Sequence, residues 1–168
     1  MIEANLSGLL SVLSTHGVEY IVIGGGAGVL MGLARTTLDV DIVYSRDLAN
    51  MQRLVAALQE HRPYLRGAPP GLPFRWDVDT LRRGLNFTLV TDIGNLDLLG
   101  EVVGGGDYRQ LLPFTKEISA FGITFRVVTL EQLIRLKRAA GRPKDLEVIA
   151  ELEALLEELA GGDPPAGG

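Results

Sequence analysis

The stretch from Thr37 to Ile42 reads TLDVDI and places two carboxylates in a segment whose other residues suit a buried strand. Successive side chains of a strand point to opposite faces, so Asp39 and Asp41 share one face and lie about 6.5–7 Å apart along it. Two anions on a half-buried strand are unfavourable unless a positive charge lies between them. The pair therefore predicts a shared cation.

Just upstream, the apolar stretch 20–23 runs into Gly24, Gly25 and Gly26. A bare glycine turn could bring backbone N–H groups close to a phosphate, and a helix expected over 27–34 would add positive potential. The alternative is a tight strand-to-helix connection. The dinucleotide fingerprint G-x-G-x-x-G fails from either outer glycine, which disfavours an NAD(P)-binding protein. A loop that can hold a phosphate, followed by two acids spaced to bind a metal ion, predicts chemistry on a nucleotide.

The composition fits a soluble protein of one domain. The chain has 168 residues, 46% of them apolar and 22% charged, which allows a single substantial core. No apolar run approaches the ~20 residues that span a bilayer, and Met1–Asn5 lacks a signal-peptide pattern. We therefore expect a cytoplasmic protein without membrane partners. The absence of cysteine excludes thiolate-bound zinc, and the net charge of −5 disfavours a broad nucleic-acid-binding surface.

Hydrophobic periodicity and turn residues predict the order of the elements. Helices are expected over 6–13, 27–34, 48–58, 129–140 and 143–159, and strands over 18–23, 38–43, 85–90, 96–99, 116–121 and 123–128. The proline-rich stretch 61–73 is expected to be a loop. Turns over 91–95 and around Gly122 predict two hairpins, and a capping box at Thr129 and a stop near Gly141 mark the ends of the helix that follows. This order predicts an α/β (α+β) fold with a mixed sheet flanked by helices, and with helices at its C-terminal end. We expect one domain over 1–160 and a disordered tail over 161–168.

A third acid, Asp97, lies between two leucines in another apolar segment. If that strand lies beside the strand of Asp39 and Asp41, all three carboxylates meet on one face. Such a set suits Mg²⁺, or Mn²⁺, better than zinc. Two ions about 3.5–4 Å apart could stabilise the attacking and leaving oxygens of a displacement at phosphorus. The alternative places Asp97 on the exposed face of a hairpin.

Lys137 is the best candidate for a cation that contacts phosphate. It continues the apolar stripe of Leu130, Leu133 and Ile134, whereas Arg135 falls away from that stripe. A lysine that faces inward needs an anionic partner, and a triphosphate would serve. The alternative is that Lys137 extends to the surface at the end of its helix.

Asp77 and Asp79 repeat the spacing of the acid pair, but without a glycine loop before them. Arg75 precedes them and Arg82 and Arg83 follow. We interpret these two acids as solvated charge.

Taken together, the glycines Gly24–Gly26, the Asp39-Val40-Asp41 pair and Asp97 resemble the polymerase-β-like nucleotidyltransferase superfamily. The segments 35–42 and 136–145 are similar to its minimal and abortive-infection, toxin-type members. The resemblance covers most of residues 18–150. Many active members have serine after the first glycine, where this chain has Gly25.

The resemblance implies transfer of a nucleoside monophosphate from a nucleoside triphosphate, with two Mg²⁺ ions. Asp39 and Asp41 would bind metal, and Asp97 would complete the site and assist deprotonation of the attacking hydroxyl. Gly24–Gly26 and Lys137 would hold phosphates. The acceptor would be an RNA end, a protein hydroxyl or a small molecule, and a toxin would have an antitoxin partner. The competing hypothesis is a non-catalytic relative whose last helix docks a partner protein.

Overall fold

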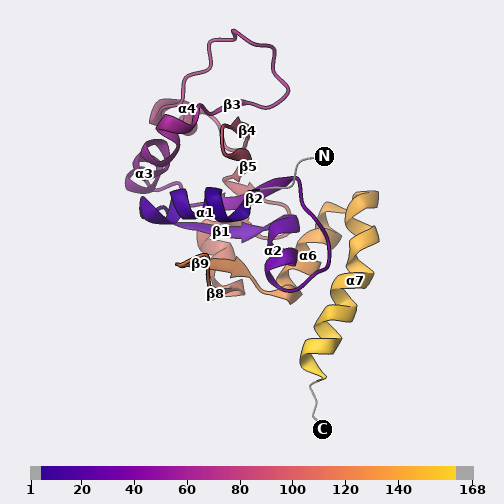
Figure 1. Ribbon diagram of the computed structural model, residues 1–168. Helices are drawn as coiled ribbons and strands as arrows, with labels where there is room; N and C mark the ends of the chain where they lie inside the picture. Colours follow the sequence, from indigo (N-terminus) through magenta and orange to yellow (C-terminus); the bar gives the residue numbers. More distant parts are fainter. Residues whose placement is uncertain (1–4, 162–168) are drawn as a thin grey trace.

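The computed structural model describes residues 5–161 (Figure 1). The helices are α1 (Leu6–Thr15), α2 (Gly24–Leu30), α3 (Leu48–Leu58), α4 (Val78–Arg83), α5 (Tyr108–Leu111), α6 (Leu130–Ala140) and α7 (Pro143–Ala160), with 3-10 turns at Gln59–His61 and Leu112–Phe114. The strands are β1 (Tyr20–Ile23), β2 (Asp39–Tyr44), β3 (Tyr64–Leu65), β4 (Phe87–Thr91), β5 (Gly94–Leu99), β6 (Glu101–Val102), β7 (Gly106–Asp107), β8 (Thr115–Ala120) and β9 (Ile123–Val128). Apart from Gly161, the tail expected over 161–168 lies outside the described residues.

One mixed sheet organises the chain and confirms the predicted fold class. Its seven strands are ordered β3-β4-β5-β2-β1-β9-β8, and β6 and β7 form a separate two-stranded sheet. β2 lies near the middle, antiparallel to β1 and parallel to β5. Both predicted hairpins are present, as β4–β5 and β8–β9. The acid-bearing strand is therefore held by a neighbour on each side.

The alternation of β2 follows its sequence. Val40 and Ile42 are fully buried in the core, as are Leu96 and Leu98 on the neighbouring β5. The aspartates between them consequently point to the opposite face of the sheet, which remains partly accessible. This alternation fixes where the carboxylates lie.

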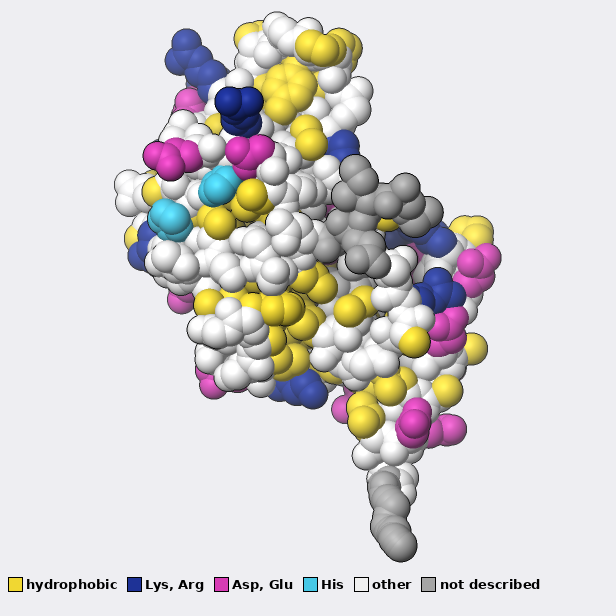
Figure 2. Space-filling model, in the orientation of Figure 1, with side chains coloured by type: hydrophobic (Ala, Val, Ile, Leu, Met, Phe, Trp, Pro, Cys, Tyr) yellow, Lys and Arg dark blue, Asp and Glu magenta, His cyan; other side chains and the backbone are white. Residues whose placement is uncertain are grey.

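The C-terminal helices form a hairpin beside the sheet. Thr129 caps α6 by accepting a hydrogen bond from the Gln132 N–H, and Gly141 ends the helix with a φ of 65°. α7 then packs against α6, which also contacts α2. Figure 1 shows α7 extending past the edge of the body, and Figure 2 shows acidic and basic side chains side by side over it. No helix within residues 5–161 is long and apolar enough to cross a membrane.

Two local expectations were wrong. α2 begins at Gly24 rather than at Ala27, because the positive φ of Gly24, 66°, turns the chain directly from the strand into the helix. The expected loop over 61–73 contains β3, which pairs with β4 at the edge of the sheet. Two residues are too few to show strand periodicity in a sequence.

Candidate active site

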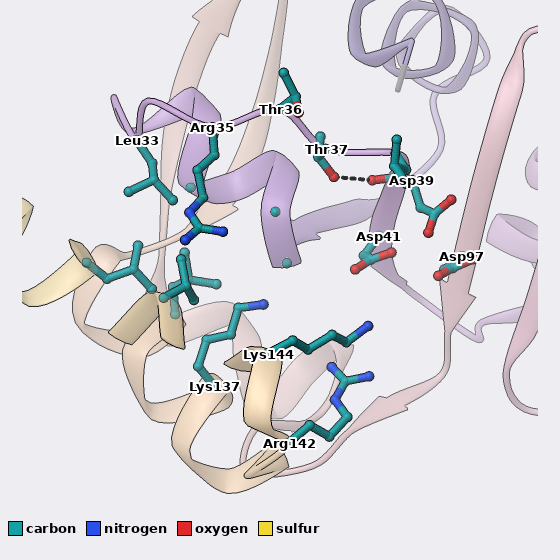
Figure 3. A pocket seen from close by; sticks show the side chains of 17 residues that line it. Leu33, Arg35, Thr36, Thr37, Asp39, Asp41, Asp97, Lys137, Arg142 and Lys144 are labelled. Carbon is teal, nitrogen blue, oxygen red and sulfur yellow. Dashed lines mark hydrogen bonds between the residues drawn. The ribbon is translucent and has the colours of Figure 1, made fainter. Parts of the chain in front are cut away.

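The three predicted acids lie on the two adjacent parallel strands. Asp41 on β2 is paired in register with Asp97 on β5, and Asp39 is paired with Asn95. The Asn95 side-chain amide donates a hydrogen bond of 3.2 Å to Asp39 Oδ1. Figure 3 shows the carboxylates of Asp41 and Asp97 close together, with Asp39 beside them. The structure thus brings all three to one face of the sheet.

Asp41 is the most perturbed of the three acids. Its Oδ1 is buried and has no hydrogen-bond partner among residues 5–161. The pKa of Asp41 is raised to about 7, mainly by burial and also by the nearby Asp97 and Asp39 carboxylates, while Lys137 acts in the opposite direction. An ionised Asp41 therefore needs more positive charge than the described side chains supply.

The glycines at the start of α2 allow the backbone to pass close to these acids. A Cβ at Gly24 would lie 2.3 Å from Asp41 Oδ2, so only glycine fits without displacing that carboxylate. Gly24 and Gly25 line the same cavity as the acids. Gly26, by contrast, is buried, and a Cβ there would lie 3.1 Å from a Leu6 methyl group. Gly26 therefore supports the packing of the helix and does not line this cavity.

A threonine hydroxyl occupies the space beside Gly25. A Cβ at Gly25 would lie 2.8 Å from Thr37 Oγ1, and that hydroxyl donates a hydrogen bond of 2.9 Å to the Asp39 carbonyl (Figure 3). A serine at position 25 would consequently collide with Thr37 in this packing. Thr37 lies two residues before the first acid, but no pattern in the sequence marks it as a residue of the site.

The cations that face the acids across the cavity come from α6 and from the start of α7. The Lys137 side chain is 20% exposed, and its Nζ lies 3.4 Å from Asp145 Oδ1. Asp145 is 1% exposed and also accepts from Arg142 Nε at 2.6 Å. Burial alone would raise the pKa of Asp145, but the bonds from Arg142 and Lys137 outweigh it and hold the pKa below its usual range. Asp145 thus fixes Lys137 on the cavity side of α6.

A cavity of about 390 Å³ lies between β2, α2, α6 and α7. Figure 3 shows the acids at one side and Lys137, Lys144 and Arg142 facing them from the C-terminal helices. The cavity also has an aliphatic part of its wall, formed by Leu33, Leu38, Leu133, Val148 and Leu152. At the rim, Arg35 NH2 lies 2.6 Å from Glu151 Oε1 and connects the segment before β2 to α7. The cavity can accept a ligand with both anionic and apolar parts.

Sequence reasoning missed Arg66, which directly follows β3. Its guanidinium forms an ion pair with Asp97 Oδ1, lies 3.7 Å from Asp39 Oδ1, and donates to the Leu89 carbonyl at 2.9 Å. Only the pairing of β3 with β4 brings this residue to the acids. Since β3 has two residues and follows a proline, the sequence carries no signal for that placement.

The second acid pair has a local structural role. Asp77 caps α4 by accepting from the Thr80 N–H at 2.8 Å, and that bonding lowers its pKa. Asp79 pairs with Arg83 one turn along the same helix, and both side chains are exposed. Neither acid lines the cavity around Asp41.

The donor set fits a hard divalent cation. In the described part of the chain, no three His, Asp or Glu side chains are arranged so that they could hold a metal ion as they stand. Arg66 engages two of the three acids. The available donors are nevertheless carboxylate oxygens, which Mg²⁺ and Mn²⁺ prefer, and the buried Asp41 Oδ1 lacks a partner among residues 5–161. Asp39, Asp41 and Asp97 are therefore the residues that would hold such an ion.

Comparison with known proteins relates the chain to others through its fold. No protein-family model and no curated protein matches the sequence. Among solved structures, the lincosamide antibiotic adenylyltransferase LnuA, with lincomycin bound, is 19% identical with a TM-score of 0.58, over 90% of this chain and 96% of that one. A protein of Thermotoga maritima described as a nucleotidyltransferase is 16% identical, with a TM-score of 0.55 over 89% and 90% of the two chains.

An antigenic nucleotidyltransferase-like protein from Paracoccidioides brasiliensis is 18% identical, with a TM-score of 0.54, over 89% of this chain and 73% of that one. Three solved structures that carry nucleotidyltransferase descriptions therefore share the architecture of this chain. At these identities the likeness establishes a nucleotidyltransferase-type fold, in agreement with the mixed sheet and its C-terminal helices.

Proposed function

We propose that this chain is a divalent-metal-dependent nucleotidyltransferase that transfers a nucleoside monophosphate from a nucleoside triphosphate to a hydroxyl group. The observation that carries the proposal is the meeting of Asp39, Asp41 and Asp97 on one face, within a cavity that also contains Lys137. Carboxylates that need a cation lie there opposite basic side chains that need an anion. A metal-bound polyphosphate satisfies both.

In the reaction, the acceptor oxygen forms a bond to the α-phosphorus. The bond from that phosphorus to the oxygen bridging the β-phosphate breaks, and pyrophosphate leaves with its electron pair. The acceptor proton passes to a base, a role that the resemblance gives to Asp97. Two bound Mg²⁺ ions would stabilise the charge that develops on the attacking and leaving oxygens.

The residues of this chain would bind the metal ions and position the nucleotide. Asp39, Asp41 and Asp97 would hold the metal ions, and Asp145, which pairs with Lys137, would keep that lysine directed at the phosphates. Lys144 and Arg142 line the same cavity and add positive charge. Gly24 and Gly25 leave room for the polyphosphate beside Asp41 because they carry no side chain, and Gly26 supports them from the core.

A small hydroxyl-bearing molecule is the first acceptor to test. LnuA, which shares the fold over nearly all of its own length, is an adenylyltransferase of lincosamide antibiotics. RNA ends and protein hydroxyls are the other two classes that the chemistry allows. If the acceptor is RNA or protein, a toxin role is the next hypothesis to test. Expression of the wild type, and not of Asp41→Ala, would then arrest growth, and an antitoxin would relieve the arrest.

Two labels of the same nucleotide test the proposal directly. Purified protein is incubated with Mg²⁺, a cell extract and each nucleoside triphosphate, labelled on either the α- or the γ-phosphate. We expect the α-label alone to appear on an acceptor, and Asp41→Ala to abolish the transfer. Asp79→Ala is the matched control, because Asp79 is an exposed acid outside the cavity. Transfer of the γ-label, or transfer that survives Asp41→Ala, would refute nucleotidyl transfer at this site.

The non-catalytic alternative predicts a different pair of results. Nucleoside triphosphate with Mg²⁺ would not raise the melting temperature at millimolar concentration. A partner protein would bind, and its binding would survive Asp39→Ala. Stabilisation by the nucleotide that depends on Mg²⁺ and is lost in Asp39→Ala supports the enzyme instead.

A further inference from the structure

We propose that Arg66 is an internal counter-ion of the acid site and competes with the divalent cation for Asp97 and Asp39. Metal binding then requires the guanidinium to leave these carboxylates. The inference rests on the proposed function, because it concerns the same three acids. It assigns a positioning role to a residue outside the predicted set.

The contacts support this role. Among the ion pairs of residues 5–161, those with Arg66 are the only ones that the three acids form. The guanidinium bridges the two strands, since Asp39 lies on β2 and Asp97 on β5. Lys137 faces the same cavity, but its ion-pair partner is Asp145. Arg66 is thus the cation that directly offsets the crowded carboxylates.

The charge balance remains incomplete with Arg66 in place. One guanidinium carries a single positive charge, whereas three carboxylates converge on the site. Asp41 Oδ1 stays buried without a partner in the described part of the chain. A divalent cation would supply the missing charge, but it would draw on the Asp97 carboxylate that Arg66 already engages. A guanidinium and a divalent ion a few ångströms apart repel each other, so each weakens the binding of the other to the carboxylates.

The location of Arg66 allows its side chain to move while its backbone stays fixed. The Arg66 N–H donates to the Thr88 carbonyl at 2.9 Å, which holds the backbone against β4. The side chain is 27% exposed and reaches the acids from the edge of the sheet. The next residue, Gly67, begins the long loop that Figure 1 shows extending away from the sheet between β3 and α4. A rotamer change that also breaks the hydrogen bond from the guanidinium to the Leu89 carbonyl would release the carboxylates without moving the backbone.

The test measures metal binding without nucleotide or turnover. Mn²⁺ is titrated into the full-length protein, and free Mn²⁺ is followed by its electron paramagnetic resonance signal. We expect Arg66→Gln to bind Mn²⁺ about tenfold more tightly than the wild type, because the competing charge is gone. Arg66→Lys keeps the charge but not the planar fork that spans two carboxylates, and should fall between them. Arg75→Gln, an exposed arginine of the same loop, controls for net charge and should match the wild type.

The outcomes separate this inference from the proposed function. If the wild type binds Mn²⁺ and Asp41→Asn does not, the acids form a cation site. Unchanged or weaker binding by folded Arg66→Gln and Arg66→Lys would then overturn the counter-ion role alone. If neither the wild type nor Arg66→Gln binds Mn²⁺ at millimolar concentration, the metal dependence of the proposed function fails, and this inference fails with it. Tighter binding by Arg75→Gln to the same degree would also overturn it.

Discussion

Asp41 and Asp97 are direct register partners on the parallel strands β2 and β5, so their carboxylates meet on one face of the sheet. Each strand alone would present a solvated acid. Together with burial, the pairing makes ionisation of Asp41 unfavourable and leaves one of its oxygens without a partner among residues 5–161. Without a compensating positive charge, ionisation of these carboxylates therefore destabilises the site.

The first prediction concerns pH and stability. In the folded protein the pKa of Asp41 is raised from its ordinary value of 3.8 to about 7. Between these values the native state holds the proton that the unfolded state has lost. The free energy of unfolding therefore falls as pH rises through this range. Asparagine stays neutral, so Asp41→Asn should resemble the wild type near pH 4 and exceed its stability above pH 7 by about 1–3 kcal/mol.

Urea unfolding at pH 4.5 and pH 8, in the presence of a chelator, checks this prediction. Asp79→Asn is the control, because Asp79 is exposed and should shift stability by less than about 0.5 kcal/mol at either pH. A stability difference between Asp41→Asn and the wild type that does not grow with pH would contradict the assignment.

The second prediction concerns the lysine that faces the cavity. Lys137→Ala should raise KM for the nucleoside triphosphate by about 10–100-fold, because a charge-assisted contact to phosphate contributes about 1.5–3 kcal/mol. Arg135→Ala removes an exposed cation from the same helix and should leave KM within about twofold of the wild type. Steady-state kinetics at constant ionic strength separate the two. Equal effects would indicate general electrostatic attraction rather than a specific contact.

The third prediction concerns the buried acid that holds the cations. Asp145→Asn should lower the free energy of unfolding by about 1–3 kcal/mol, because Arg142 and Lys137 lose their shared partner. Since the folded-state pKa of Asp145 is depressed, its contribution exists above the ordinary pKa of an aspartate and is lost as pH falls through the lowered value. The deficit of Asp145→Asn should therefore be larger at pH 7 than at pH 3.

A surface pair supplies the control for that measurement. Arg138 NH2 lies 2.6 Å from Glu153 Oε2 between the same two helices, but both side chains are about half exposed. Glu153→Gln should cost no more than about 0.5 kcal/mol at either pH. If the two variants lose the same stability, burial does not strengthen the Asp145 cluster.

Sequence patterns predicted those parts of the fold that are determined by residues close together in the chain. The alternation around Val40 predicted which face of β2 carries the acids, and the turn after Thr91 predicted the β4–β5 hairpin that presents Asp97. Thr129 and Gly141 marked the ends of α6 because capping involves residues a few positions apart. Each of these signals lies within one element or one turn.

The contacts that depend on packing between distant segments could not be predicted in the same way. Arg66 reaches Asp97 only because β3 pairs with β4, and a strand of two residues leaves no periodicity to detect. The fit between Gly25 and Thr37 likewise depends on how α2 packs beside β2. The glycines before the acid pair indicated that the backbone passes close to another group, but not that this group is the side chain of Thr37.

The last prediction uses two glycines that share a backbone conformation and differ in their surroundings. Gly24 has a φ of 66° and Gly122 a φ of 75°, so alanine should cost about 1–2 kcal/mol of strain at either position. At Gly24 the new methyl group would also lie 2.3 Å from Asp41 Oδ2, whereas at Gly122 no described atom beyond the two neighbouring residues would lie within 4 Å of it. We therefore expect Gly24→Ala to lose about 1–3 kcal/mol more than Gly122→Ala in urea unfolding. The proposed transferase activity should fall at least about 100-fold in Gly24→Ala, because Asp41 must move, and Gly122→Ala should keep it. If Gly24→Ala keeps wild-type activity, the carboxylate beside that glycine does not take part in the reaction.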